Sequence, residues 1–232
     1  MGRRDVAFWR TWAADVGGPC LEFGCGTGRL LAPLARQTRG LVGIDRSRAM
    51  LARARRRVRR LAPARRPALV LGDIRSLPLS RGSCVGVFAP YGVLQSLTSD
   101  ADLDAALREA ARVLRRRGRL AIDLVPDLPA WRTYARTARF RGQLRGRPVA
   151  LFESVRQDRR RGLTIFDEEF VVGAGRARQR HRFSLTFRTI PMETLLARIT
   201  RAGFAIDAVQ GDYRGAVWTP DADAWIIQAT RR

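Results

Sequence analysis

Three glycines at alternate positions form the strongest chemical signal in the sequence. Within Leu21–Leu30, Gly24, Gly26 and Gly28 follow a short apolar stretch, and an apolar helical pattern begins at the last glycine. Glycines at such positions permit positive φ and let a ligand approach the backbone where a Cβ would otherwise intrude. The N–H groups exposed at a helix start favour a negatively charged ligand group. The run therefore predicts a ligand-binding loop between a strand and a helix.

Acidic residues accompany this loop at informative spacings. The glycines follow G-x-G-x-G rather than the dinucleotide fingerprint G-x-G-x-x-G, and Glu22 lies just before the first of them. A second acidic residue ends the segment Gly43–Asp45, which begins 17 positions after Gly26. In Rossmann-like folds an acidic side chain about 20 residues on accepts hydrogen bonds from ribose hydroxyls. Asp45 is therefore predicted to hold a ribose, although it could instead cap the following helix.

Two further segments complete a series of four. Gly72–Ile74 follows the third expected strand, and Phe88–Tyr91 ends the fourth. All four segments fall at the carboxyl ends of consecutive strands, where open α/β sheets bind ligands. Taken singly, Glu22 or Asp73 could merely cap or start a turn. Four segments in order favour a binding site.

Together these motifs resemble the class I, Rossmann-like S-adenosylmethionine-dependent methyltransferases, whose first motif has an acidic-x-G-x-G-x-G form. The resemblance implies S-adenosylmethionine as cofactor and S-adenosylhomocysteine as product. It places Asp73 against the adenine amino group and Phe88–Tyr91 at the methyl-transfer site. The cofactor-binding residues that it implies are Glu22, Gly24, Cys25, Gly26, Thr27, Gly28, Asp45, Arg46, Met50, Gly72, Asp73, Ile74, Ala89, Pro90 and Tyr91.

The nearest likeness is to small-molecule methyltransferases with an antiparallel insertion before the last helix, such as the amino-sugar N,N-dimethyltransferases. Ala202–Phe204, Gly211–Tyr213 and the apolar stretch Trp225–Ala229 carry this likeness. Those relatives have a longer N-terminal segment over the pocket, so their N-terminal site residues are not transferred to this chain. The likeness implies a small-molecule acceptor that is methylated at nitrogen or oxygen. A cofactor-binding protein without methyl transfer is an alternative, because fold alone does not fix function.

The first half of the chain alternates short apolar runs with amphipathic stretches, which is typical of a parallel sheet with crossover helices. The expected strands are Pro19–Phe23, Leu41–Ile44, Ala68–Leu71, Cys84–Ala89 and Arg119–Val125. The expected helices are Asp5–Asp15, Gly28–Gln37, Ser47–Leu61 and Asp102–Arg116, the last closed by Gly118 in a left-handed conformation.

The second half indicates antiparallel pairing, because short turns separate its apolar runs. Strands are expected at Val149–Gln157, Leu163–Val172 and Arg178–Arg188, followed by a helix at Pro191–Ala202 and strands at Phe204–Val209 and Asp223–Ala229. The predicted fold is α/β, with a seven-stranded, mostly parallel Rossmann-like sheet. An antiparallel β lid, about residues 149–188, is inserted after the fifth strand, and residues 1–232 form a single domain.

The formal charge of +23 raises the question of a nucleic-acid partner, since basic residues bind phosphates. Every basic residue is arginine and none is lysine, which is typical of a compositional bias rather than of a phosphate-binding surface. An RNA methyltransferase remains an alternative. The chain shows no appended RNA-binding module and no Asn/Asp-Pro-Pro-Tyr motif, so a nucleic-acid partner is possible but not favoured.

Candidates for acceptor contacts are fewer. His181, the only histidine, shares a strand face with Phe183, Leu185 and Phe187, and could act as a base or pack as a bystander. Tyr91 is the second catalytic candidate. Asp123 and Asp127 follow the fifth strand; Trp131 and Tyr134 could form an aromatic wall or pack a helix; Glu168 and Glu169 could bind a cationic acceptor or pair with arginines.

Apolar runs and cysteines indicate where the protein resides and whether it holds disulfides or a metal. No apolar run approaches the roughly 18 residues that span a bilayer, and the N-terminus lacks the apolar stretch of a secretory signal. No membrane partner and a cytoplasmic location are therefore expected. Cys20, Cys25 and Cys84 are odd in number and lack zinc-ligand spacing, so we expect neither a disulfide framework nor a metal site.

Overall fold

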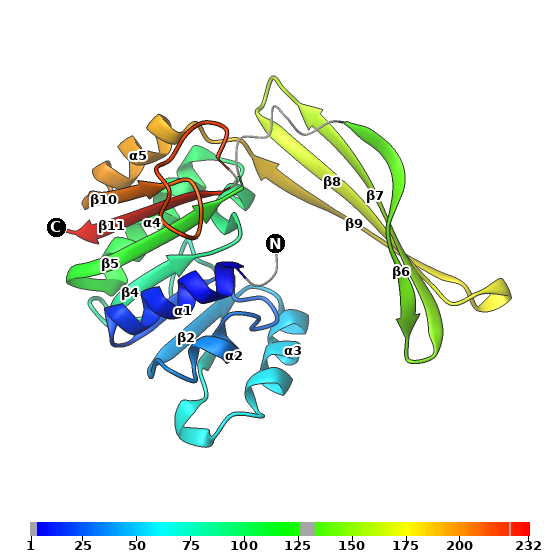
Figure 1. Ribbon diagram of the computed structural model, residues 1–232, viewed down its shortest axis with the longest axis horizontal. Coiled ribbons are helices and arrows are strands. Elements are labelled where there is room, and N and C mark those ends of the chain that lie inside the picture. The colour runs from blue at the N-terminus through cyan, green and yellow to red at the C-terminus, as the bar shows by residue number, and fades with distance from the viewer. Residues whose placement is uncertain (1–3, 126–132, 223) are drawn as a thin grey trace. The chain divides into compact units, whose positions relative to one another are not determined.

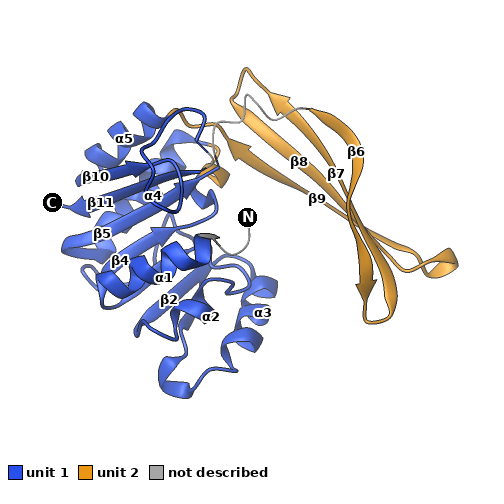
Figure 2. Ribbon diagram, in the orientation of Figure 1, with its two compact units in different colours: residues 1–94, 99–126, 192–232 blue, residues 95–98, 127–191 orange. Residues whose placement is uncertain are grey.

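The computed structural model describes residues 4–125, 133–222 and 224–232. Two compact units make up the chain (Figure 2): residues 1–94, 99–126 and 192–232 form unit 1, and residues 95–98 and 127–191 form unit 2. The candidate residues Asp127 and Trp131 lie outside the described residues.

Unit 1 contains a seven-stranded sheet (Figure 1), with the strand order β10-β11-β5-β4-β1-β2-β3. Strands β3, β2, β1, β4 and β5 run parallel, and β11 runs antiparallel to both of its neighbours. This confirms the predicted mostly parallel Rossmann-like sheet. The strands are β1 (Cys20–Phe23), β2 (Leu41–Asp45), β3 (Ala68–Leu71), β4 (Cys84–Ala89), β5 (Leu114–Leu124), β10 (Phe204–Gln210) and β11 (Trp225–Arg231).

The helices of unit 1 are α1 (Arg4–Val16), α2 (Leu31–Leu34), α3 (Arg48–Val58), α4 (Asp100–Val113) and α5 (Met192–Arg201). Helix α1 covers β4 because Trp9 and Trp12 lie on one helical face. Their ring centroids are 5.4 and 5.7 Å from that of Phe88, and all three side chains are buried. No helix within the described ranges is long and apolar enough to cross a membrane.

Helix α2 is much shorter than the predicted Gly28–Gln37. Turns occupy the residues from Gly26 to Leu30, and the regular helix ends at Leu34. Pro33 lies inside this helix and has no N–H, so it cannot donate the hydrogen bond that would join it to the turn before. The proline restricts a segment whose apolar pattern alone favours a longer helix.

The end of helix α4 also differs from the prediction. The helix stops at Val113, and Leu114 is already extended with φ −73° and ψ 142°. Arg117, not Gly118, takes the left-handed conformation, with φ 60°. Gly118 is needed for another reason, since a Cβ there would lie 2.8 Å from the carbonyl oxygen of Arg115. The prediction of Gly118 as a left-handed helix cap is therefore wrong.

Unit 2 is a four-stranded antiparallel sheet with the order β6-β7-β8-β9. Its strands are β6 (Tyr134–Leu144), β7 (Arg147–Asp158), β8 (Leu163–Val172) and β9 (Gln179–Arg188). The antiparallel layer after the fifth strand is thus confirmed. Strand β6 was not expected, because register shifts after Tyr134 and after Ala138 interrupt the alternation that marks a strand.

Candidate functional site

The glycine loop follows β1 and has the backbone that its sequence predicts. Gly24, Gly26 and Gly28 have φ of 60°, 53° and 70°. A Cβ at Gly24 would lie 2.5 Å from Cγ2 of Val93, and one at Gly28 would lie 3.3 Å from Cβ of Ala54. A Cβ at Gly26 would meet only the carbonyl oxygen of Gly24, at 3.9 Å. Two of the glycines therefore permit close packing, whereas Gly26 leaves open space beside its backbone.

Asp45 connects this loop to its neighbours. One carboxylate oxygen accepts a hydrogen bond from Gly26 N at 2.8 Å, and the other accepts from Ser47 N at 2.8 Å. The Asp45 carbonyl accepts from Gly72 N at 3.1 Å. Ser47, rather than Asp45, caps helix α3, since its hydroxyl accepts from Met50 N. The loops after β1, β2 and β3 thus meet at one residue, Asp45.

Other residues that were predicted to bind the cofactor lie around this junction. Cys25 is buried and its N–H donates to Ile44 O at 3.0 Å. Thr27 accepts a 3.4 Å hydrogen bond from Arg57. Arg46 and Met50 are exposed at the start of the segment that follows β2, and Ile74, Ala89 and Pro90 are buried.

Glu22 is a buried carboxyl group, and one of its oxygens lacks a hydrogen-bond partner among the described residues. It is 3% exposed, and Oε2 accepts no hydrogen bond from any described residue. Burial raises the pKa of Glu22 to about 8, the nearby Arg29 opposes this shift, and the Asp45 charge adds to it. An orphaned buried oxygen of this kind costs folding free energy unless something binds it.

Replacing Glu22 with glutamine should therefore stabilise the free protein at high pH. A carboxyl whose pKa is raised on folding stabilises the fold below its unfolded value, near 4.5, and that stability is lost as pH rises towards 8. Glu22→Gln cannot ionise, so we expect it to match the parent at pH 4 and to exceed it by on the order of 2 kcal/mol at pH 9. Urea unfolding at the two pH values measures the difference.

Glu193→Gln is the matched control, because Glu193 is exposed on helix α5. Its pH dependence should follow that of the parent. An identical pH dependence for Glu22→Gln and the parent would show that Glu22 is not destabilised by burial.

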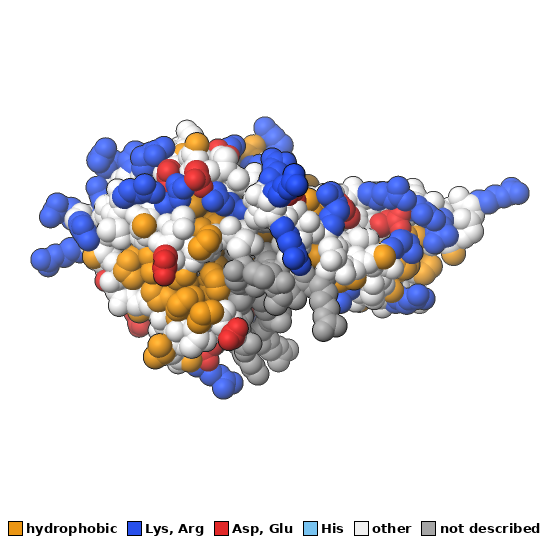
Figure 3. Space-filling view, turned by 90° about the horizontal axis from the view of Figure 1, so that it is seen from above, with side chains coloured by type: hydrophobic (Ala, Val, Ile, Leu, Met, Phe, Trp, Pro, Cys, Tyr) orange, Lys and Arg blue, Asp and Glu red, His pale blue; other side chains and the backbone are white. Residues whose placement is uncertain are grey.

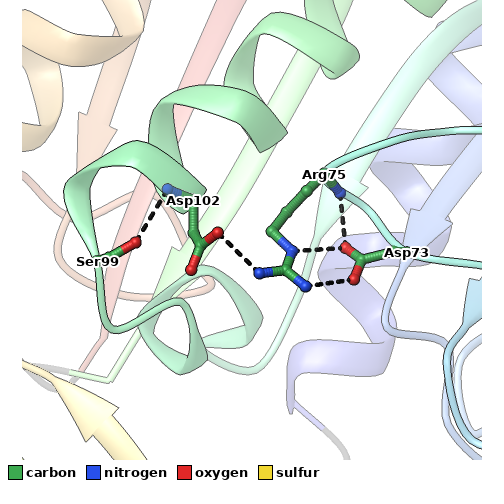
Figure 4. Close-up of polar contacts among 4 residues, drawn as sticks. All are labelled: Asp73, Arg75, Ser99 and Asp102. Atoms are coloured by element: carbon green, nitrogen blue, oxygen red, sulfur yellow. Dashed lines mark hydrogen bonds and ion pairs between the residues drawn. The ribbon is translucent and has the colours of Figure 1, made fainter.

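Asp73 is held by an arginine on the same loop (Figure 4). Arg75 donates to both Asp73 carboxylate oxygens, at 3.0 and 2.7 Å, and also to Asp102 at 2.7 Å. These hydrogen bonds and the Arg75 charge lower the pKa of Asp73. Asp102 lies in the first turn of α4, where its N–H donates to the Ser99 cap. An adenine contact by Asp73 stays a prediction and would share the carboxylate with Arg75.

Tyr91 follows β4 in a strained backbone conformation, with φ 61°, and its side chain is 57% exposed. Asp123, near the end of β5, holds Gly92, the residue that follows Tyr91. One Asp123 carboxylate oxygen accepts a hydrogen bond from Gly92 N at 3.1 Å. The other oxygen accepts from the Tyr213 hydroxyl at 2.8 Å. Burial raises the pKa of Asp123 to about 6, against the lowering effect of these hydrogen bonds. Non-glycine residues with positive φ often mark functional loops.

Sequence reasoning missed Asp5, Arg29 and Tyr213. The Asp5 side chain is almost fully buried and forms an ion pair with Arg29, with 2.5 Å between the two charged atoms. The Arg29 guanidinium lies 5.6 Å from the centroid of the Tyr91 ring. The position of Asp5, one turn before Trp9 on the same helical face, was the available signal. Tyr213 lies in the segment Gly211–Tyr213 that carries the family likeness, but its bond to Asp123, 90 positions away, could not be predicted from spacing.

The candidates of unit 2 lie on its sheet. His181 is exposed on β9, opposite Phe170 of β8. Tyr134 begins β6, where its hydroxyl donates to Glu153. Its place in an aromatic wall or against a helix stays a prediction. Neither role that was predicted for His181 is tested by this placement.

Comparisons with known proteins agree with this geometry. Residues 20–118 match the family described as a methyltransferase domain. Methyltransferase GfsG of Streptomyces halstedii is 40% identical over 109 residues, which cover 47% of this chain and 38% of that protein. The aligned part thus spans well under half of the length of this relative.

Solved structures also resemble the whole chain, and two of them illustrate the match. An S-adenosylmethionine-dependent methyltransferase from Clostridium acetobutylicum superposes with a TM-score of 0.82 at 16% identity, covering 100% of this chain and 92% of that one. The chain has the Rossmann-like methyltransferase fold. CalS10, an amino pentose methyltransferase from Micromonospora echinaspora solved with bound S-adenosylmethionine, superposes with a TM-score of 0.74 at 21% identity, covering 100% and 92%. The methyltransferase resemblance read from the glycine loop is thereby confirmed.

Proposed function

We propose that this protein is an S-adenosylmethionine-dependent methyltransferase that methylates a small molecule at nitrogen or oxygen. The observation that carries the proposal is the open space beside Gly26, next to the carboxylate of Asp45. Glycine at this position lets a ligand reach the backbone, and an acidic side chain after β2 is placed to accept hydrogen bonds from ribose.

The residues present fit the cofactor. Asp45 has two oxygens at the junction of three loops and would hold the ribose. The orphaned oxygen of Glu22 would accept a hydrogen bond from the amino-acid part, which would offset its burial. The loop of Gly72–Ile74 would hold the adenine. Each assignment follows the family resemblance and the placement of the loop.

The cofactor supplies an electrophilic methyl group, so the protein mainly has to align the acceptor with it. Alignment of this kind can contribute on the order of 7–11 kcal/mol without a covalent intermediate. A general base is required only where the acceptor is a hydroxyl or a protonated amine. Tyr91 and His181 are the candidates for such contacts.

A small acceptor is supported by the kind of protein that shares the fold. CalS10 is an amino pentose methyltransferase, and it matches both the sheet of unit 1 and the antiparallel layer of unit 2, since the superposition covers the whole chain. The identity of 21% limits this support to the fold. We therefore propose the acceptor class without naming a compound.

Replacing Asp45 with alanine tests the cofactor assignment. We expect S-adenosylhomocysteine binding to weaken by about 1.5–3 kcal/mol, the range for hydrogen bonds to a charged group. Asp207→Ala is the matched control, because Asp207 is an exposed aspartate of unit 1 whose carboxylate accepts from Thr230, away from the glycine loop in sequence. Isothermal calorimetry should show nearly unchanged affinity for the control.

A deoxy analogue separates a direct contact from a disturbed loop, since Asp45 also holds Gly26 and Ser47. The 2′-deoxy analogue of S-adenosylhomocysteine should bind the parent more weakly than the natural compound does. Asp45→Ala should bind the two compounds almost equally. Unchanged affinity of Asp45→Ala for the natural compound would refute the assignment.

A further inference from the structure

One face of the unit 2 sheet carries a cluster of charged side chains beside an aromatic ring. Phe152, Glu169 and Arg182 are aligned across β7, β8 and β9, so they share one face. Neighbouring Glu168 and Phe183 are aligned on the opposite face. The first face therefore bears a charged cluster, which we call the arginine groove.

Three arginines converge on one carboxylate in this groove. Arg136 donates two hydrogen bonds to one oxygen of Glu169, at 3.0 and 2.8 Å. Arg182 donates to the other oxygen at 2.9 Å, and Arg180 donates to the same oxygen at 3.3 Å. Three guanidinium groups thus meet a single carboxylate, which leaves the cluster with an excess of positive charge.

The cluster is well held. Glu169 is 7% exposed, and the arginine hydrogen bonds lower its pKa to about 2, so it stays ionised. The Arg136 guanidinium carbon lies 3.4 Å from the Phe152 ring centroid, a cation–π contact that fixes its plane. Because Glu169 orders the guanidiniums in advance, a ligand that binds them would not have to order them itself.

The groove has space and free donors. Its volume is about 520 Å³, and the residues that line it are Arg136, Phe152, Ser154, Asp167, Glu168, Glu169, Arg180, Arg182, Phe183 and Ser184. Two other carboxylates line the groove: Asp167 already accepts from Arg156 and Ser184, and Glu168 belongs to the opposite face of β8. Glu169 is therefore the carboxylate that the three arginines share. The Arg182 side chain is 72% exposed, and each guanidinium has five N–H donors, more than Glu169 uses.

We propose that the arginine groove of unit 2 binds an oxyanion, a carboxylate or phosphate group. Planar guanidiniums match both oxyanions through paired hydrogen bonds.

Calorimetry with inorganic pyrophosphate and with malonate tests the proposal on the full chain. We expect the parent to bind at least one of them in the millimolar range or tighter, and the stronger of the two identifies phosphate or carboxylate as the source. Arg182→Gln and Arg180→Gln should each weaken that binding by about tenfold. Both side chains are substantially exposed, so the fold should be kept, as a thermal melt would show.

Arg141→Gln is the matched control, because Arg141 is an exposed arginine of β6 outside this groove. It removes the same charge and should change the affinity less than about twofold. Absence of binding to both probes in the parent, or equal weakening by the control, overturns the proposal. S-adenosylhomocysteine affinity, measured in parallel, should be the same in the parent and in the three variants. A parent that does not bind S-adenosylhomocysteine would count against the proposed function only.

Discussion

Replacing Gly26 with alanine should nearly abolish cofactor binding while leaving the fold intact. The added Cβ would enter the open space in which the cofactor is proposed to lie, and it would also strain a backbone at φ 53°. We expect S-adenosylhomocysteine affinity to fall by about two orders of magnitude, which is ~2.7 kcal/mol. Calorimetry and a thermal melt measure the two effects separately.

Gly175→Ala supplies the matched control. Gly175 has nearly the same backbone, with φ 55°, and nothing lies within 4 Å of an added Cβ. It belongs to the short 3₁₀ turn Gly175–Ala177 of unit 2. Both substitutions carry the same left-handed strain of about 1 kcal/mol, so they should lower the melting temperature equally. If both or neither lost cofactor affinity, the open space at Gly26 would not be the cofactor site.

The parallel half of the fold could be predicted because its signals are local. Apolar runs such as Ala68–Leu71 and Cys84–Ala89 were predicted with the bounds that the structure gives them. Each is short, lies between turn residues and contains β-branched side chains, which is the pattern of a strand in a parallel sheet. The conformation of the glycine loop could also be predicted, since it depends on the glycines themselves.

The parts that escaped prediction depend on distant partners. Strand β6 carries two bulges and many arginines, and it becomes a strand by pairing with β7 rather than by its own pattern. The Arg29–Asp5 ion pair joins residues 24 positions apart, and Tyr213 reaches Asp123 over 90 positions. No spacing rule links such residues, so only the packed chain shows that they meet.

Removal of unit 2 should separate cofactor binding from methyl transfer. Unit 1 holds all seven strands of its sheet together with the glycine loop and Asp45, and unit 2 has a sheet of its own. Replacing residues 127–191 by a short Gly-Ser linker should therefore leave S-adenosylhomocysteine affinity within about threefold of that of the full chain. A cooperative thermal transition would show that the shortened protein folds.

Methyl transfer should be lost in the same protein. We propose that unit 2 orients the acceptor, and without that alignment the displacement at the methyl group loses most of its rate advantage. The assay follows labelled methyl from S-adenosylmethionine to whichever acceptor a small-molecule panel identifies with the full chain. All the residues that are proposed to bind the cofactor lie in unit 1, so a loss of both binding and transfer would mean that unit 2 also supports the cofactor. Transfer at a near-normal rate by the shortened chain would show instead that the acceptor is held by unit 1, with Tyr91 and the loop fixed by Asp123 as its nearest candidates.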